Sequence, residues 1–275
     1  MASGEEGKGE TVLVTGASGF IGSTLVRGLL GRGYNVRAGV LDPDDRAETD
    51  HLLALAAGAG AGRLSFFRCD LLDGAALLDA ARGCSGVFHL ASPCTVDPVK
   101  DPQVWYPASK TLAEKAAWKF AEENGLDVVV VNPGTVLGPM IPPAINASMA
   151  MFCRLLQGCT EEYADFFLGP VHVEDVAMAH ILVFESASAS GRHLCVHSIC
   201  HWSDFAAKVA ELYPDYKVPK YAERNHTLFP MDTQPGLVRQ EVGSKKLIAL
   251  GLQITPMEKI IRDAVESLKS RGHIS

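Results

Sequence analysis

Short apolar runs alternate with amphipathic segments through the first half of the chain. The apolar runs predict buried strands at 12–14, 34–40, 64–69, 86–92 and 127–132. Between them, apolar residues at helical spacing predict helices at about 20–31, 51–57, 75–82 and 107–124. Strands that alternate with helices are typical of a parallel, doubly wound sheet. The first half of the chain is therefore expected to be an α/β domain of that kind.

The regular alternation ends near residue 138. Prolines, methionines and amphipathic segments follow, and they predict a smaller, mostly helical lobe. Ser203 is expected to cap a helix that ends near Leu212, and Thr255 with Glu258 forms the capping-box pattern of the last helix. We therefore predict a nucleotide-binding domain from 10–138 plus about 171–200, and a substrate lobe from about 139–170 and 201–275.

The junction between the first strand and the first helix carries a glycine at every third position, namely Gly16, Gly19 and Gly22. Gly16 gives the turn its backbone geometry, Gly19 lets a pyrophosphate approach the main chain, and Gly22 lets helix and strand pack closely. The helix N-terminus then directs free N–H groups at the phosphates. The spacing is G-x-x-G-x-x-G rather than G-x-G-x-x-G, so a tight turn without a ligand is the alternative. The strand before it and the helix after it favour dinucleotide binding in a Rossmann-type domain.

Composition and charge narrow the class of partner. The 275 residues are 47% apolar, which is enough for a large core, and the net charge of −7 argues against nucleic acid and anionic membranes as partners. The apolar runs are too short to cross a bilayer, and residues 1–10 lack the apolar region of a signal peptide. Seven scattered cysteines suggest free thiols in a reducing compartment. A cytoplasmic location is expected.

Tyr106 and Lys110 form a Tyr-x-x-x-Lys pair at the start of a predicted helix. Residues at this spacing share a helix face, and a nearby ammonium lowers the pKa of a phenol. Such a tyrosine can transfer a proton near neutral pH. The pair also occurs by chance, and a solvated lysine beside a packed tyrosine is the alternative. Together with the glycine turn, the pair points more specifically to catalysis.

Other polar residues have simpler interpretations. His193, His197 and His201 lie in or near one predicted strand and are expected to be hydrogen-bonded or exposed. Cys195 and Cys200 are expected to be free thiols. The run with His172, Glu174 and Asp175 is expected to be the start of a helix. No metal site is predicted, because such a site needs convergent ligands.

Six stretches of the sequence match one family. They are TGASGFIG at 15–22, DL at 70–71, GVFHLASP at 86–93, WYPASKTLAEKAAW at 105–118, NPG at 132–134 and VHVEDVA at 171–177. With them the chain resembles the extended short-chain dehydrogenase/reductases, and most of all the plant cinnamoyl-CoA reductase and dihydroflavonol reductase group. The resemblance covers nearly the whole chain.

The resemblance implies NADP-dependent reduction of a carbonyl or a hydroxycinnamoyl-CoA thioester, in phenylpropanoid or lignin chemistry, by a monomer or weak dimer. An aldehyde or dihydroflavonol reductase is the alternative within the family. Tyr106 would donate the proton, and Lys110 would hold the nicotinamide ribose. The implied cofactor contacts are Gly16, Ser18, Gly19, Phe20, Ile21, Gly22, Asp70, Leu71, Leu90, Ala91, Ser92, Tyr106, Lys110, Pro133 and Val136.

The end of the second predicted strand departs from the family pattern. Leu41 stands where the family has the arginine that holds the 2′-phosphate of NADP, and Asp42 beside a ribose would favour NAD. Arg37 or Arg46 could hold the phosphate instead. We expect NADP as the cofactor with Arg37 as a contact, and NAD as the alternative because of Leu41.

A larger departure follows Pro93. The family continues there into a helix and then a central strand that carries the catalytic serine, whereas here 97–103 runs directly into Val104. This indicates an internal deletion between Gln103 and Val104. The strand at 127–132 could slide into the vacant place through one right-handed crossover, and Thr95 or Ser109 are weak substitutes for the serine. Loss of such a donor costs roughly a hundred- to a thousandfold in rate, so an impaired enzyme or a non-catalytic NADP-binding isoform is expected.

Overall fold

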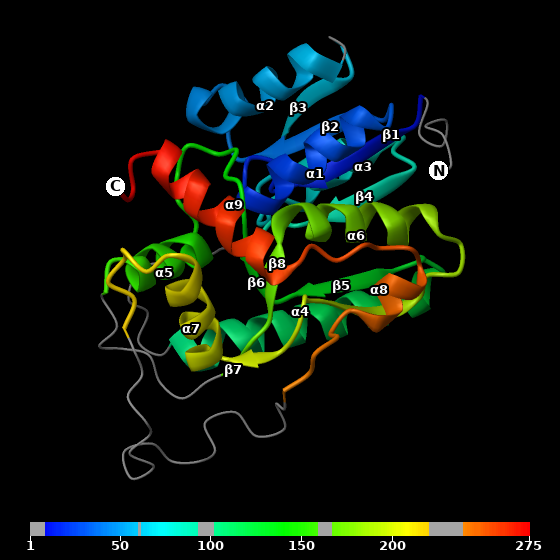
Figure 1. Ribbon diagram of the computed structural model, residues 1–275. Helices are drawn as coiled ribbons and strands as arrows, with labels where there is room; N and C mark the ends of the chain where they lie inside the picture. Colours follow the sequence, from blue (N-terminus) through cyan, green and yellow to red (C-terminus); the bar gives the residue numbers. More distant parts are fainter. Residues whose placement is uncertain (1–8, 60–61, 93–101, 159–166, 220–238) are drawn as a thin grey trace.

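The computed structural model describes residues 9–59, 62–92, 102–158, 167–219 and 239–275, and the side chains of 58–59 and 102–107 are not described. Four parallel strands form the main sheet in the order β3-β2-β1-β4 (Figure 1). They are β1 (Thr11–Thr15), β2 (Asn35–Val40), β3 (Leu64–Arg68) and β4 (Gly86–His89). The predicted α/β class with a parallel sheet is confirmed, and these strands lie within a few residues of their predicted positions.

Helices cover both faces of this sheet. On one face, α1 (Phe20–Gly31) and α6 (Val173–Glu185) lie side by side, and their apolar residues share a core with Val12 and Val14 (Figure 1). On the other face, Leu13 packs in a small core with Ala80 of α3 (Gly74–Ala81). Alternate residues of β1 therefore supply two cores, as expected for a central strand.

The second half of the sheet is separate from the first. The strand β5 (Val129–Pro133) pairs in parallel with β9 (Gly191–Cys195), and it does not pair with β4. The expectation that this later strand slides into the place beside β4 is therefore wrong. Two further pairs are small: parallel β6 (Thr135–Leu137) with β8 (Pro170–His172), and antiparallel β7 (Phe167–Leu168) with β10 (Cys200–His201).

The long helix α4 (Pro102–Asn124) leads from the first sheet towards β5 (Figure 1). It begins five residues earlier than predicted, with Pro102 rather than Pro107 at its start. Proline suits the first turn of a helix because the N–H that it lacks has no intrahelical acceptor there. Among the described side chains of α4, Ala121 is the buried one. This helix is therefore mostly a solvated element.

The C-terminal part adds helices around a second large core. They are α5 (Ala147–Leu156), α7 (Trp202–Leu212), α8 (Lys245–Ala249) and α9 (Met257–Ser270), while α2 (Arg46–Ala59) belongs to the first half. Phe205 packs between Phe152 and Trp202, with ring centroids 6.0 and 5.8 Å away. The same core extends to Val171 and to the apolar side of α9. The predicted division into two domains stays a prediction.

Two predicted helix caps are corrected. His201, not Ser203, caps α7: its Nδ1 accepts the N–H of Ser203, and the Asp204 carboxylate accepts the N–H of His201. For α9, Pro256 occupies the N-cap position without a side-chain cap, because the Thr255 hydroxyl donates to Asp175 instead. The start of α7 is thus set by a local capping box centred on His201, and that of α9 is set by a contact with the distant Asp175.

Within the described residues, every helix is too short or too polar to cross a membrane.

Candidate functional site

The glycine turn connects β1 to α1 at the carboxyl end of the main sheet. Gly16 has a φ of +66°, a conformation that suits glycine, and Gly19 is the N-cap of α1 without a side-chain cap. The first N–H groups of a helix have no intrahelical acceptor. The turn therefore presents backbone donors and the positive end of the helix dipole at one point, which is the arrangement that binds phosphates.

The three glycines differ in what a side chain would meet. A Cβ on Gly22 would lie 2.1 Å from the carbonyl oxygen of Gly16, and a Cβ on Gly16 would lie 2.9 Å from Cα of Ala91. At Gly19 the nearest protein atom would be 3.3 Å away. The protein's own packing thus requires glycine at the first and third positions. At the second, the missing side chain leaves the backbone approachable, which fits a pyrophosphate.

The end of β4 lies directly beside this turn. Thr15 is 2% exposed, and its hydroxyl oxygen accepts the N–H groups of Leu90 and Ala91, both at 3.2 Å. With both acceptor positions used, the hydroxyl donates to Nδ1 of His89 at 2.9 Å. This network holds Leu90 and Ala91 against Gly16, so three predicted contact residues gather at the turn. Ser92 follows them and is half-buried.

The ends of β2 and β3 adjoin the same turn. The N–H of Ala17 donates to the carbonyl of Gly39 at 3.1 Å, and the N–H of Cys69 donates to the carbonyl of Val40 at 2.7 Å. Asp70 follows Cys69, and its carboxylate accepts the N–H of Leu72 at 2.9 Å. Asp70 and Leu71, the predicted adenine contacts, therefore lie on the same edge of the sheet as the glycines.

Arg37 is placed elsewhere. Its guanidinium donates to the carbonyls of Ala80 and Arg82, at 2.9 and 2.6 Å, and lies over the ring of Phe67 with 4.9 Å to the centroid. It thus satisfies the last carbonyls of α3, at the edge of the sheet opposite the glycine turn. The prediction that Arg37 contacts the cofactor is corrected, because β2 directs this side chain to the end of a helix.

The Tyr-x-x-x-Lys pair lies on α4. Tyr106 is in the helix, but its side chain is outside the described part of the structure. Burial of the ring, and then the positive charge of the exposed Lys110, hold the pKa of His89 below its ordinary value. The lysine therefore lies near the end of β4. Thr95 is outside the described residues, and Ser109 is an exposed residue of α4.

The last predicted contacts lie on the other side of the interrupted sheet. Pro133 ends β5 and is exposed, while Val136 is 6% exposed and belongs to the same core as Phe20. Among the described residues, β5 pairs with β9 alone, so no hydrogen-bonded strand there joins Pro133 to the glycine turn. The structure brings the contacts from the first half together and leaves Pro133 in a separate strand pair.

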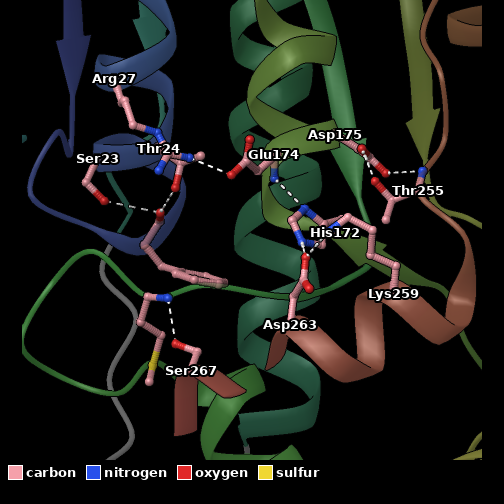
Figure 2. Close-up of polar contacts among 12 residues, drawn as sticks. Ser23, Thr24, Arg27, His172, Glu174, Asp175, Thr255, Lys259, Asp263 and Ser267 are labelled. Carbon is pink, nitrogen blue, oxygen red and sulfur yellow. Dashed lines mark hydrogen bonds and ion pairs between the residues drawn. The ribbon is translucent and has the colours of Figure 1, made fainter. Parts of the chain in front are cut away.

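A polar network that the sequence interpretation missed links α1, α6 and α9 (Figure 2). Arg27 of α1 pairs with Glu174 of α6 at 2.7 Å. His172 caps α6, because its Nδ1 accepts the N–H of Glu174, and its Nε2 lies 3.1 Å from the carboxylate of Asp263. Asp263 also pairs with Lys259. The predicted role of His172 as a structural helix start fits this geometry.

Cys195 and Cys200 are free thiols, and burial raises their pKa values to about 12 and about 11. In the part of the chain that the structure describes, no three His, Cys, Asp or Glu side chains converge as metal ligands.

Comparison with known proteins places the chain in a family. The model of the NAD dependent epimerase/dehydratase family matches residues 12–99 and 92–196. The chain belongs to this family. Within it, the chain is 36% identical to cinnamoyl-CoA reductase CAD2 of Medicago truncatula and 34% identical to cinnamoyl-CoA reductase 1 of Petunia hybrida. These matches cover 96% and 97% of this chain, and 97% and 94% of the relatives. The predicted membership of the cinnamoyl-CoA reductase-like group of extended short-chain dehydrogenase/reductases is confirmed.

Solved structures agree with this family's fold. Vestitone reductase from Medicago sativa has a TM-score of 0.77 at 27% identity, covering 96% of this chain and 99% of that protein. Yeast methylglyoxal/isovaleraldehyde reductase Gre2, solved with NADPH, has a TM-score of 0.74 at 21% identity, covering 96% of this chain and all of that protein. The protein is thus an α/β member of a group of NAD(P)-dependent reductases.

The same comparisons bear on the deletion. The match to CAD2 extends over 327 positions, yet 96% of this chain is about 264 residues, so about 63 aligned positions have no residue here. The family model matches in two segments that meet at 92–99, a few residues before the deletion predicted between Gln103 and Val104. The interruption of the sheet between β4 and β5 falls at the same place in the chain.

Proposed function

We propose that this family member is an NAD(P)-dependent reductase of a carbonyl compound or a hydroxycinnamoyl-CoA thioester, and that this form works slowly. The observation that carries the proposal is the glycine turn, where Gly19 leaves an uncapped helix start approachable beside Leu90 and Ala91. The curated relatives named cinnamoyl-CoA reductase support the substrate class. A small phenylpropanoid-type molecule is the expected substrate.

The residues have separate roles in this proposal. The N–H groups at the start of α1 bind the pyrophosphate, and Asp70 and Leu71 border the adenine. Lys110 holds the nicotinamide ribose and lowers the pKa of the Tyr106 phenol, which protonates the substrate oxygen. The bound dinucleotide would supply the hydride. Leu90, Ala91 and Ser92 line the ribose, and Pro133 and Val136 are the proposed contacts on the nicotinamide side.

The slow rate follows from the interrupted sheet. In the family that this chain resembles, a strand between the counterparts of β4 and β5 carries the serine that holds the substrate carbonyl. Here β4 bonds to β1 and β5 bonds to β9. Removal of one such donor lowers a rate roughly a hundred- to a thousandfold, and a misplaced reacting group lowers it further. The protein is therefore expected to turn over substrate well below the rate of its relatives.

A steady-state assay tests the proposal. The purified chain is mixed with feruloyl-CoA, cinnamaldehyde or a dihydroflavonol, and oxidation of NADPH or NADH is followed at 340 nm. We expect measurable but slow turnover that Tyr106→Phe abolishes, while Tyr213→Phe, a change of the same kind in the C-terminal part, leaves it unchanged. Turnover at the rate of an intact relative would contradict the impairment, and turnover that survives Tyr106→Phe would contradict the catalytic role.

A second candidate is a dinucleotide-binding protein without catalysis. The separation of β5 from β4 favours it, because the catalytic helix α4 lies between these two strands in the chain. Calorimetric titration with NADPH and NADH separates the candidates. Binding without turnover of any carbonyl substrate would support the second, and turnover would exclude it.

A further inference from the structure

The segment that follows β2 would face the 2′-phosphate on the adenosine ribose of NADP, and it is strongly acidic. Residues 41–50 contain five carboxylates and a single guanidinium. Leu41 is 60% exposed, and its N–H donates to the Glu48 carboxylate at 2.8 Å. The position at the end of β2 therefore has an apolar side chain, and its backbone donor already has an anionic partner.

Two contacts bring this segment against the glycine turn. The end of β2 accepts a hydrogen bond at Gly39 from the N–H of Ala17. From α2, Nε2 of His51 lies 3.1 Å from the carbonyl of Ser18. Since a carbonyl only accepts, Nε2 carries the proton of this bond. The acidic segment thus adjoins the turn from both its strand and its helix.

Two arginines near this segment already have partners. Arg46 binds both carboxylate oxygens of Asp50, each at 3.1 Å. Arg271, whose charge acts on His51, donates to the carbonyls of Met140 and Ile141. Arg68 lies opposite Val40 in the register of β2 and β3 and is exposed. A 2′-phosphate at the end of β2 would have to draw Arg46 or Arg271 from an existing bond, or rely on Arg68 from the neighbouring strand.

His51 does not supply the missing positive charge. Burial lowers its pKa below the ordinary value, the charge of Arg271 lowers it further, and the bond to Ser18 opposes both effects only in part. Its Nδ1 is buried and has no hydrogen-bond partner among the described residues. A neutral ring whose single N–H already donates to Ser18 offers a phosphate neither a charge nor a free donor.

We infer that this protein binds NAD(H) in preference to NADP(H), and that Glu48 and Leu41 set the preference. The inference rests on the proposed function, since it concerns the same nucleotide site. A free 2′-hydroxyl can donate to a carboxylate such as that of Asp42, whereas a 2′-phosphate brings a charge near −2 to a segment whose formal charge is already −4. The names of the relatives do not determine this preference, because Leu41 departs from the family pattern.

Isothermal titration of the full chain with NADH and with NADPH tests the inference without relying on turnover. We expect the Kd for NADH to be lower by about tenfold or more at low ionic strength. Equal affinities, or tighter binding of NADPH, would overturn the inference and leave the proposed function standing. Binding of neither nucleotide would overturn the proposed function, and the inference with it.

Three variants locate the cause of the preference. Glu48→Gln keeps an acceptor for the N–H of Leu41 but removes a charge. It should bring the ratio of the Kd for NADPH to the Kd for NADH closer to one. Leu41→Arg should reverse the ratio. The control is Leu53→Arg, which adds the same charge at an exposed position of α2 (51% exposed) and should leave the ratio close to wild type.

Circular dichroism and the thermal midpoint confirm that each variant is folded. If Leu53→Arg shifts the ratio as much as Leu41→Arg, net charge rather than the position beside the ribose sets the preference. If neither Glu48→Gln nor Leu41→Arg moves it, the assigned residues are wrong.

Discussion

The helices α1 and α4 differ sharply in how far the rest of the chain covers them. In the twelve residues of α1, the buried positions are Phe20, Gly22, Ser23, Thr24, Leu25, Val26, Leu29 and Leu30. In the 23 residues of α4, Ala121 is the buried one among the described side chains. Leu112 and Phe120 of α4 are 65% and 57% exposed.

The difference shows that sheet contacts, and not helix sequence alone, stabilise these helices. α1 lies on the continuous four-stranded sheet β3-β2-β1-β4, and α6 packs beside it. The deletion predicted between Gln103 and Val104 falls in the first turn of α4, and this helix is tied to β9 by the ion pair of Glu114 with Arg192 at 2.6 Å. A helix that loses its neighbours keeps its backbone bonds but gains little from burial.

The largest expected effect comes from truncating one leucine in each helix. Leu25→Ala removes a side chain that is fully buried, and it should lower the free energy of unfolding by about 2–5 kcal/mol. Leu112→Ala should change it by less than about 0.5 kcal/mol. Urea unfolding followed by circular dichroism measures both. A comparable cost for Leu112 would mean that a covered surface exists on α4 in solution, and the contrast would fail.

A second pair of changes tests the packing at the two ends of α1. Gly22→Ala places a Cβ 2.1 Å from the carbonyl oxygen of Gly16, so the backbone must shift at a cost of about 3 kcal/mol. Gly31→Ala meets no atom within 4 Å and should be neutral or stabilising by about 0.5–1 kcal/mol. Thermal unfolding compares them. Equal midpoints would show that the close approach of helix to strand is not required.

A third change tests the polar network that links α6 to the C-terminal helix. The carboxylate of Asp175 is 6% exposed and accepts the N–H and the hydroxyl of Thr255, at 2.8 and 2.7 Å (Figure 2). Asp175→Ala should cost about 1–3 kcal/mol, because a backbone donor loses its partner. Thr255→Val removes the hydroxyl alone and should cost less. If both cost the same in urea unfolding, the backbone bond contributes nothing.

The smallest effect is expected at the contact that holds α4. Hydrogen bonds from Arg192 and then from Trp118 keep the pKa of the Glu114 carboxyl below its ordinary value. A lowered folded-state pKa stabilises the protein above the ordinary value, near pH 4.3, and the contribution is lost as the pH falls through the folded-state pKa. Because Arg192 is 66% exposed, Glu114→Gln should cost less than about 1 kcal/mol at neutral pH.

Urea unfolding of wild type and Glu114→Gln between about pH 7 and pH 3 measures this effect. The two curves should converge at the acid end, where the wild-type carboxyl is protonated as well. Glu123→Gln, on the exposed side of the same helix, should match wild type in free energy of unfolding across the whole pH range. A difference that persists at the acid end would mean that shape, rather than charge, holds α4 in place.

Much of the first half was predictable from local pattern. The strands around Val12 and Val36 and the turn from Gly16 to Gly22 follow from apolar periodicity and glycine spacing, which act over a few residues. The gathering of Leu90, Ala91 and Asp70 at one edge followed because parallel strands end at a common edge of the sheet. The family resemblance added the expected functions of these residues.

Other features depended on contacts between distant residues. No local rule directs Arg37 to the end of α3, or Thr255 to Asp175 rather than to its own helix. Likewise, β5 pairs with β9 although Val129 and Gly191 are 62 positions apart in the sequence. Such contacts involve groups whose proximity is set by the packed fold, and sequence spacing says nothing about them.

By itself, the sequence determined the element types, the glycine turn and the family, because these reflect backbone preference and local periodicity. Only the tertiary structure decided that the sheet is interrupted after β4, that α4 is mostly solvated, and that the end of β2 presents Leu41 and Glu48 beside the turn. The physical reason is that burial, strand pairing and the local electric field are sums over neighbours in space, and the order of residues specifies those neighbours only through the fold.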